Sequence, residues 1–413
     1  MTTTHPLPQP SLPSRIRGSL LGLACVDALG APLEFTTRGS YTESAGQPLK
    51  ELIDNPNFDL PPGHWTDDTS MTLCLAESLV ACDGRMDVLD QVRRYIRWYR
   101  QGYLSSAPSR GCFDIGNATR MALTIWEAEL DHPHRHQRHQ PHSLPEDGDR
   151  DDDGEEAKKA TAKRASVAQR KINQSLDRKA QCGNGALMRC APITLVYHDP
   201  DRHSAAEILD LARRSAEVTH PYPVNGEACG VYCLLLRAAL SSTTVATKEH
   251  LAALLAAHEW QNESLRTRFA KYRPGTLYSP PPSSPTSPPV SASTAASILQ
   301  PWHATPAHQI SSSGYVVDTL EAALWAFFTT ATFEEGAVKV VNLGNDADTV
   351  GAVYGGLAGG FYGLEDVPSR WLTGLQRREE VLQGVVEGVV RLVCGDGGDD
   401  DGKDDGDGLG KGT

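Results

Sequence analysis

Two clusters of aspartate and threonine residues are the parts of this sequence best suited to chemistry. In the first cluster, Thr66, Asp67 and Asp68 stand directly before a run of helical apolar periodicity that begins at Met71. Taken alone, this cluster is explained as a helix start, because a threonine N-cap and acidic residues in the first turn stabilise any helix, the cap by about 1 kcal/mol.

The second cluster changes the interpretation of the first. Asp346 and Asp348 are two positions apart, so a locally extended backbone would direct both carboxylates to one side, and Thr349 opens the next expected helix. Helix capping alone could explain Asp348 or Thr349. Two such clusters at helix starts in glycine-rich surroundings nevertheless favour convergence on hard divalent cations, because carboxylate and hydroxyl oxygens suit Mg²⁺ or Mn²⁺ rather than Zn²⁺. Aspartates held this close would repel one another unless cations lay between them.

The segments that would position these clusters show helical periodicity. Apolar residues recur at helical spacing in several stretches, and alternating β-branched runs are few. These stretches start at Ile16, Met71, Val231 and Leu320. In the first of them, Gly18 and Gly22 fall on one face and would permit close packing against another helix. We therefore predict an all-α fold, a single compact domain of many helices.

Four segments have compositions that predict disorder, because they hold too little apolar surface to offset the entropy of ordering. They are residues 1–14, 131–178, 274–313 and 395–413. The second begins with a histidine-rich tract, for which we expect no dedicated metal site, and the third is rich in proline and serine. The predicted domain is therefore 15–394, interrupted by two disordered insertions.

The net charge restricts the class of partner. The 413 residues carry a formal net charge of −13, to which the segment 395–413 contributes seven Asp and two Lys. The remainder is still acidic, which argues against nucleic acid as the main partner, because neutralising phosphates requires a basic surface. The N-terminus has no apolar stretch of signal-peptide length, and we find no run of about 18 apolar residues. We therefore expect an intracellular, cytoplasmic protein with no membrane partner.

Seven segments, in order along the chain, resemble the ADP-ribosylglycohydrolase family, which includes dinitrogenase reductase-activating glycohydrolase and the eukaryotic ADP-ribosylhydrolases. The segments are GSLLGLACVDALGAPLEF (18–35), WTDDTSM (65–71), GCFDIGNATRMAL (111–123), GNGALMRCAPI (183–193), THPYPVNGEAC (219–229), GYVVDTLEAALWAF (314–327) and NLGNDADTVGAVYGGLAGGFYG (342–363). Seven ordered matches over residues 18–363 are far more specific than any single motif.

The resemblance implies an all-α domain with a binuclear Mg²⁺ site, in which Mn²⁺ could substitute. The implied metal ligands are Thr66, Asp67, Asp68, Asp346, Asp348 and Thr349. Glu34 matches an acidic residue beside the metals that is implicated in catalysis or in gating the site. The chain departs from the family at Val26, where many relatives have glycine before the aspartate that corresponds to Asp27. This departure is a difference in buried packing.

The resemblance also implies which residues face the substrate. Asp114 matches a position near the substrate guanidinium in arginine-directed bacterial members, and a carboxylate can accept paired N–H donors from that planar group. A helix cap or an Asx turn explains Asp114 equally well. Asn117, in the same segment, is a further predicted substrate contact.

A glycine-containing loop and two ring-bearing residues complete the predicted site. Gly183, Asn184 and Gly185 resemble the loop that approaches the phosphates and ribose, where glycines let backbone N–H groups come close to an anion. An ordinary tight turn is the alternative. His220 matches a substrate-side histidine, although a histidine before proline is often a structural hydrogen-bonder. Tyr315 either lines the pocket or packs in the core.

The predicted reaction is hydrolysis of the glycosidic bond between ribose C1″ of ADP-ribose and a modified protein side chain, releasing ADP-ribose. The metals would hold the ribose hydroxyls and a water and would lower the pKa of that water. Glu34 or Asp68 would act as the base, and Asp114 would orient the leaving guanidinium, which favours arginine. The alternatives are hydrolysis of O-linked serine or small-molecule conjugates, and a catalytically silent relative that binds ADP-ribose. The expected partner is an ADP-ribosylated protein or conjugate, and the expected state is a monomer.

Overall fold

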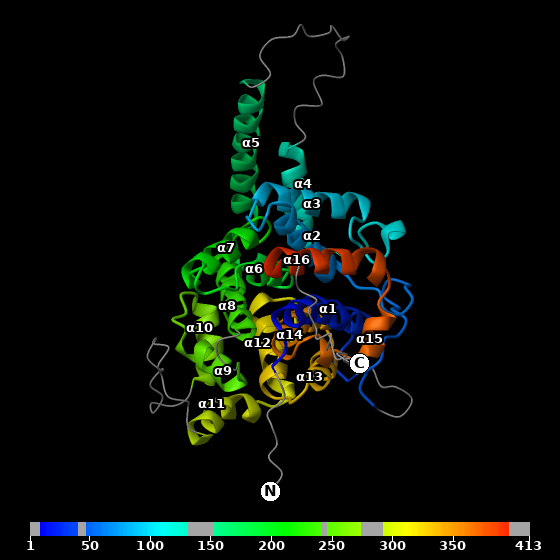
Figure 1. Cartoon of the computed structure of the whole chain (residues 1–413), viewed down its shortest axis with the longest axis vertical. Helices are drawn as coiled ribbons and strands as arrows, with labels where there is room; N and C mark the ends of the chain where they lie inside the picture. The colour runs from blue at the N-terminus through cyan, green and yellow to red at the C-terminus, as the bar shows by residue number, and fades with distance from the viewer. Residues whose placement is uncertain (1–8, 40–46, 131–151, 242–245, 274–291, 396–413) are drawn as a thin grey trace, which may run out of the picture.

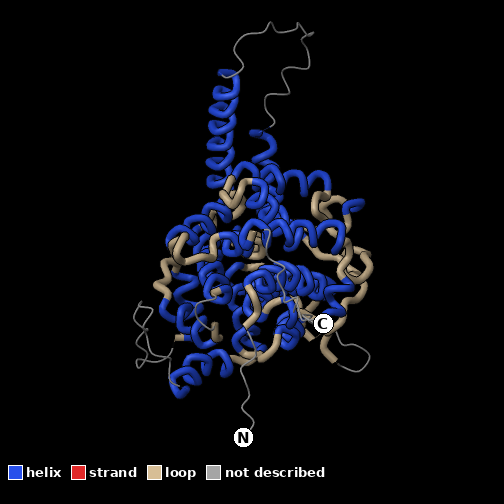
Figure 2. The backbone as a smooth tube through the Cα atoms, viewed as in Figure 1, coloured by secondary structure: helices blue, strands red, loops and turns tan. Residues whose placement is uncertain are grey.

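The computed structural model describes residues 9–39, 47–130, 152–241, 246–273 and 292–395. Over these residues the chain consists of helices joined by loops, with no β-strand (Figures 1 and 2). The α-helices are α1 (Leu12–Gly30), α2 (Asp67–Ala81), α3 (Val88–Gln101), α4 (Asn117–Leu130), α5 (Asp152–Leu176), α6 (Ala191–Val196), α7 (Ala205–Glu217), α8 (Pro223–Leu240), α9 (Lys248–Ala257), α10 (Glu263–Phe269), α11 (Ala292–Ala304), α12 (Val316–Phe328), α13 (Phe333–Val341), α14 (Ala347–Tyr362), α15 (Ser369–Gly374) and α16 (Gln383–Cys394). The prediction of an all-α fold is confirmed.

Helices α1 and α14 form an antiparallel pair within the helical body (Figure 1). A Cβ on Gly18 would lie 2.4 Å from the carbonyl oxygen of Gly359, and one on Gly22 would lie 2.9 Å from that of Gly355. Because real Cβ atoms do not approach so closely, the predicted role of these two glycines in helix packing is confirmed. A Cβ on Gly30, the last residue of α1, would lie similarly close to the carbonyl oxygen of Ala347, the first residue of α14. The C-terminal end of α1 therefore lies beside the N-terminal end of α14.

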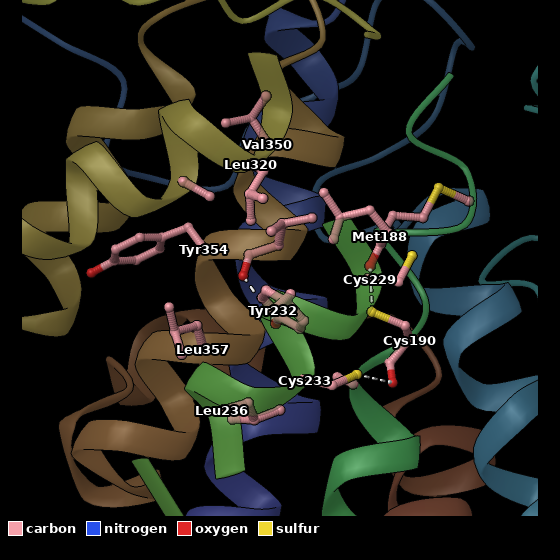
Figure 3. Packing of buried hydrophobic residues seen from close by; sticks show 14 of the residues in the cluster. Met188, Cys190, Cys229, Tyr232, Cys233, Leu236, Leu320, Val350, Tyr354 and Leu357 are labelled. Atoms are coloured by element: carbon pink, nitrogen blue, oxygen red, sulfur yellow. Dashed lines mark hydrogen bonds between the residues drawn. The ribbon is translucent and has the colours of Figure 1, made fainter. Parts of the chain in front are cut away.

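Helix α8 packs against α14 in the core, and the segment before α6 packs against α8. Tyr232 on α8 donates a hydrogen bond from its hydroxyl to the carbonyl oxygen of Val353 at 3.1 Å (Figure 3). Figure 3 also shows Cys190 next to Cys233, whose thiol donates to the carbonyl oxygen of Cys190 at 3.7 Å. Met188 lies at the edge of this cluster and also lines the pocket described below. The core thus supports the wall of that pocket directly.

Helix α1 is apolar enough to be compared with a membrane span. A window within residues 12–33 has a mean hydropathy of 1.3, although charged residues, among them Arg17 and Asp27, interrupt the apolar ones. In the structure 94% of this window is buried inside the protein, where α1 packs against α14 and α16. This burial is typical of the core helix of a folded domain.

The expectation of disorder is wrong for residues 152–176, which form α5. Ala168, Ile172 and Leu176 recur every four residues and are buried, and α5 packs against α4. The high proportion of charged residues in this segment concealed the apolar stripe, because composition averages over all faces of a helix. Residues 131–151, including the histidine-rich tract, lie outside the described residues.

The second predicted insertion and both termini are also partly ordered. Trp302, in α11, is buried and stacks on Tyr272 with ring centroids 3.6 Å apart, and Ile310 is buried nearby in sequence. A few large apolar residues in a segment rich in serine and alanine were enough to anchor it. Helix α1 already begins at Leu12. The remaining parts of the segments predicted to be disordered, 1–8, 274–291 and 396–413, lie outside the described residues.

Candidate active site

A pocket of about 510 Å³ opens where the end of α1 meets the starts of α2, α4 and α14. Its wall contains most of the predicted site residues. These are Glu34, Asp67, Asp114, Asn117, Gly183, Asn184, Gly185, His220, Asp346, Asp348 and Thr349. The helix pairing explains the convergence, because α1 and α14 bring Glu34 and Asp348 together although they are far apart in sequence.

The start of α2 is capped from another helix. Thr66 occupies the N-cap position, but its side chain makes no capping hydrogen bond. Instead, the carboxylate of Asp27 on α1 accepts hydrogen bonds from the backbone N–H groups of Thr66 and Thr69, each at 3.0 Å. The local-capping explanation of Thr66 is therefore wrong. Sequence reasoning missed the role of Asp27, and the signal was a single carboxylate in the otherwise apolar stretch from Leu20 to Gly30.

The carboxylates from the two predicted clusters form one group. Oxygen atoms of Asp27, Asp68 and Asp348 lie within 4.8 Å of one another, and so do oxygen atoms of Glu34, Asp114 and Asp348. Asp348 belongs to both sets. The hydroxyl of Thr349 donates to Asp68 Oδ2 at 3.2 Å, which links the second cluster to the first. The two clusters predicted from the sequence do converge.

Burial and mutual repulsion disfavour the ionised forms of these carboxyl groups. Burial, followed by the charges of neighbouring aspartates, raises the pKa values of Asp68 and Asp348 well above their ordinary values. The same causes raise the pKa of Asp114 to about 7, and burial raises the pKa of Asp346 to about 6. No salt bridge within the described part of the chain reaches any of these groups. The group therefore holds a concentration of negative charge without a protein counter-charge.

The donor set fits divalent metal ions. Asp68 Oδ1, Asp348 Oδ1 and Glu34 Oε2 are buried and have no hydrogen-bond partner. Buried carboxylate oxygens without partners are costly, and a hard cation that accepts several oxygen ligands would satisfy them. Hydroxyl oxygens of Thr66 and Thr349 lie among the same carboxylates. The residues present thus suit Mg²⁺ or Mn²⁺, with oxygen donors only.

The loop at 183–185 is fixed against three other segments. Asn184 donates through Nδ2 to Thr319 Oγ1 at 2.8 Å and to Asp346 Oδ2. The backbone of Gly183 pairs with that of Tyr315. A Cβ on Gly185 would lie 2.9 Å from His220 Cε1, so this position requires glycine. The loop is therefore more than an ordinary tight turn, because it ties the pocket wall to α12 and to the carboxylate group.

Arg189 is a support residue that sequence reasoning missed. It is fully buried, and its guanidinium donates to the carbonyl oxygen of Gly185 and to Thr219 Oγ1, both at 2.8 Å. Because Thr219 Oγ1 accepts from Arg189, its proton is available to His220 Nδ1, 2.8 Å away. Burial followed by the charge of Arg189 lowers the pKa of His220 to about 3. His220 is thus held as a neutral ring in the pocket wall.

The remaining predicted residues occupy different positions. Asp114 lies in the pocket wall near Glu34. Asn117, at the start of α4, is exposed and accepts from Arg120 through Oδ1 at 2.5 Å. Tyr315 occupies the N-cap position of α12 and packs partly buried against the core, whereas its neighbour Gly314 lines the pocket.

Phe35 is a third residue whose role sequence reasoning missed. It lines the pocket and is 73% exposed, unusually high for a phenylalanine. Its backbone has a φ of 60°, in the left-handed region, and its N–H donates to the carbonyl oxygen of Asn345 at 2.7 Å. Asn345 also has a left-handed φ, of 57°. Two strained residues thus join the end of α1 to the loop before α14 and hold an aromatic ring at the pocket rim.

The family to which the chain belongs accounts for this combination of fold and pocket. The chain matches the ADP-ribosylglycohydrolase family over residues 8–398, and it belongs to that family. The protein is therefore an ADP-ribosyl glycohydrolase, as the resemblance in the sequence implied.

Three similar proteins illustrate the relationship. The chain is 32% identical over 358 residues to the ADP-ribosylarginine hydrolase Tri1 of Pseudomonas putida (strain GB-1), covering 87% of this chain and 73% of that relative. It is 28% identical over 372 residues to the ADP-ribosyl-[dinitrogen reductase] glycohydrolase of Rhodospirillum rubrum, covering 90% and 93%. A solved chain described as an ADP-ribosylglycohydrolase-related protein complex matches with a TM-score of 0.59 and 34% identity, covering 93% of this chain and 99% of that chain.

Proposed function

We propose that this protein removes ADP-ribose from modified arginine side chains of proteins, using two Mg²⁺ ions bound by its carboxylate group. The observation that carries the proposal is the convergence of unpartnered buried oxygens of Glu34 and Asp348 on a pocket that also holds Asp114. Asp68, which also has an unpartnered oxygen, lies beside Asp348. The relatives named as an ADP-ribosylarginine hydrolase and an ADP-ribosyl-[dinitrogen reductase] glycohydrolase support the same substrate class.

The ions would be held by the residues of the two clusters. These residues are Thr66, Asp67, Asp68, Asp346, Asp348 and Thr349. When bound, the ions would neutralise the carboxylates, orient the ribose hydroxyls and make a water molecule more acidic.

Glu34 is the better candidate for the base. It lines the pocket, and its Oε2 has no hydrogen-bond partner. Asp68, in contrast, does not line the pocket. Its Oδ2 accepts a hydrogen bond from the hydroxyl of Thr349 at 3.2 Å, and its unpartnered Oδ1 is assigned to an ion. Glu34 Oε2 would accept a proton from the attacking water while the water oxygen bonds to C1″. The C1″–N bond breaks, and its electron pair leaves with the neutral guanidine. The guanidine then takes up the proton that Glu34 accepted from the water, which returns Glu34 to its ionised form.

Asp114 would orient the arginine. Its carboxylate lies near Glu34 in the pocket wall, where it can accept two N–H donors from a planar guanidinium. Such a cation would also relieve the repulsion that Asp114 experiences from Asp346, which contributes to its raised pKa. A serine-linked conjugate offers no cation at this point, which is why arginine is preferred here.

The test is release of ADP-ribose from arginine-linked and serine-linked proteins, with Mg²⁺ and with a chelator. We expect release from the arginine-linked protein only with Mg²⁺, and none from the Asp346→Asn variant. The matched control is Asp87→Asn, which alters an exposed helix cap outside the pocket wall. This variant should retain activity. Preferential release from the serine-linked protein would contradict the arginine assignment, and full activity of Asp346→Asn would contradict the metal site.

A further inference from the structure

We propose that helix α5 is the docking surface for the protein that carries the ADP-ribosyl group, and that it selects targets with acidic residues beside the modified arginine. The inference rests on the proposed function, which it extends from the modified side chain to the protein around it.

The position of α5 makes it a neighbour of any protein bound at the pocket. Figure 1 shows α4 and α5 standing side by side and α5 projecting from the body of the molecule. Helix α4 begins in the pocket wall at Asn117, and α5 leads back into that wall at 180–181. With 25 residues, α5 is about 37 Å long at about 1.5 Å per residue. A protein whose ADP-ribosyl group enters the pocket is therefore close enough to contact this helix.

The charge of α5 is opposite to that of the whole protein. Between residues 158 and 171 the helix carries six basic residues and no acidic one, in a chain with a net charge of −13. The basic residues are Lys158, Lys159, Lys163, Arg164, Arg170 and Lys171. Arg178 and Lys179, both exposed, follow Asp177 and add two positive charges near the edge of the pocket. A local positive surface on an acidic protein fits an acidic partner by charge complementarity.

Three of these basic residues lie on the face of α5 that is turned away from the body. Lys159, Lys163 and Arg170 are separated by four and seven residues, so they share one helical stripe. All three are exposed, and the apolar residues that hold α5 in place recur on the opposite face. We call these three residues the basic stripe.

The basic stripe has no structural task within the described part of the chain. Lys163 and Arg170 make no salt bridge there, and Lys159 has only a 4.0 Å contact with Glu155 on its own helix. Lys171 provides the contrast, because it pairs with Glu129 at 2.5 Å and so links α5 to α4. The stripe can therefore be altered without removing the contacts that position the helix.

The test compares a protein substrate with a small one. The variant Lys159→Glu, Lys163→Glu, Arg170→Glu is assayed on a folded protein ADP-ribosylated at an arginine flanked by acidic residues, and on free ADP-ribosylarginine. We expect kcat/KM for the protein substrate to fall by about tenfold or more through KM, and KM of the wild type to rise with salt. Hydrolysis of ADP-ribosylarginine should be unchanged, which also shows that the variant folds.

A matched control changes the charge equally at other sites. Lys50→Glu, Arg202→Glu, Arg391→Glu alters three exposed residues that neither line the pocket nor belong to α4 or α5. It should leave both activities intact.

Other outcomes would overturn the proposal in distinguishable ways. Equal loss on both substrates would mean that the stripe supports the pocket, and no loss on either would mean that it does not dock the target. Stripe-dependent binding to double-stranded DNA, with unchanged hydrolysis of the protein, would assign the stripe to nucleic acid. A wild-type protein that hydrolyses neither substrate would instead disprove the proposed function, and the docking surface with it.

Discussion

The carboxylate of Asp27 accepts two hydrogen bonds from Thr69, from the backbone N–H at 3.0 Å and from the hydroxyl at 2.5 Å, both at Oδ2. Oδ1 accepts from the N–H and hydroxyl of Thr66. One buried side chain on α1 thus accepts from two backbone N–H groups at the start of α2, Thr66 and Thr69. The carboxylates of Asp67 and Asp68 are positioned from α1 rather than from within their own helix.

Replacing Asp27 should therefore affect both stability and the site. We expect Asp27→Asn to lower the free energy of unfolding by about 1–3 kcal/mol, because an amide cannot accept four hydrogen bonds and leaves buried donors unpaired. It should also weaken the rise in Tm produced by Mg²⁺. Urea unfolding and thermal melts with and without Mg²⁺ measure these effects.

Asp87→Asn is the control for capping alone. Asp87 caps α3 by accepting from the N–H groups of Leu89 at 2.8 Å and Asp90 at 3.1 Å, at an exposed position outside the pocket. It should lower stability slightly and leave the response to Mg²⁺ unchanged. An Asp27→Asn variant with a normal response to Mg²⁺ would refute the positioning role.

The sequence was sufficient to find the aspartates that the fold brings together, and insufficient to find the residues that support them. Asp67, Asp68, Asp346 and Asp348 were recognisable because carboxylates cluster locally at two helix starts. Arg189 gave no local signal, since its partners at Gly185 and Thr219 are brought to it only by the folded chain.

The same distinction between local and long-range signals explains the errors in the fold. Charge-rich composition predicted disorder for α5, whereas a stripe of one apolar residue in four sufficed to pack it against α4. Composition reports the average of a segment, and packing depends on a single face.

Mg²⁺ should stabilise the protein more at high pH than at low pH. Burial raises the pKa of Asp346 to about 6, and burial with neighbouring charges raises that of Asp114 to about 7. Raised pKa values mean that the metal-free folded protein holds protons more tightly than the unfolded chain, so its stability falls as pH rises from about 4 to about 7. Bound cations favour the ionised carboxylates and offset this loss.

Thermal melts in Mg²⁺ and in chelator at about pH 5 and about pH 8 check this linkage. The Mg²⁺-dependent rise in Tm should be larger at the higher pH. Equal melting temperatures in Mg²⁺ and chelator at both pH values would argue against cations among these carboxylates.

Phe35 should contribute to substrate binding rather than to stability. Its ring is 73% exposed at the pocket rim, so Phe35→Ala removes little packing. We expect KM for ADP-ribosylarginine to rise by about three- to tenfold, as for the loss of an aromatic contact of about 1 kcal/mol, with kcat nearly unchanged. Steady-state kinetics test this, and Phe35→Tyr should retain the wild-type KM. A fall in kcat with an unchanged KM would show that the ring contributes to a step other than substrate binding.

Two glycines of the pocket loop should respond differently to the same substitution. A Cβ at Gly185 would lie 2.9 Å from His220 Cε1 and 3.0 Å from Thr119 Oγ1, whereas the nearest atom to a Cβ at Gly183 is His220 Nε2 at 3.5 Å, an ordinary contact. Gly185→Ala must displace His220 or the loop, and His220 is fixed through Thr219 to Arg189. We expect kcat/KM to fall by about tenfold or more for Gly185→Ala, because small displacements of positioning groups are costly, and to change little for Gly183→Ala. Equal effects of the two substitutions would show that the loop adapts, and that its contact with His220 does not set the geometry of the pocket.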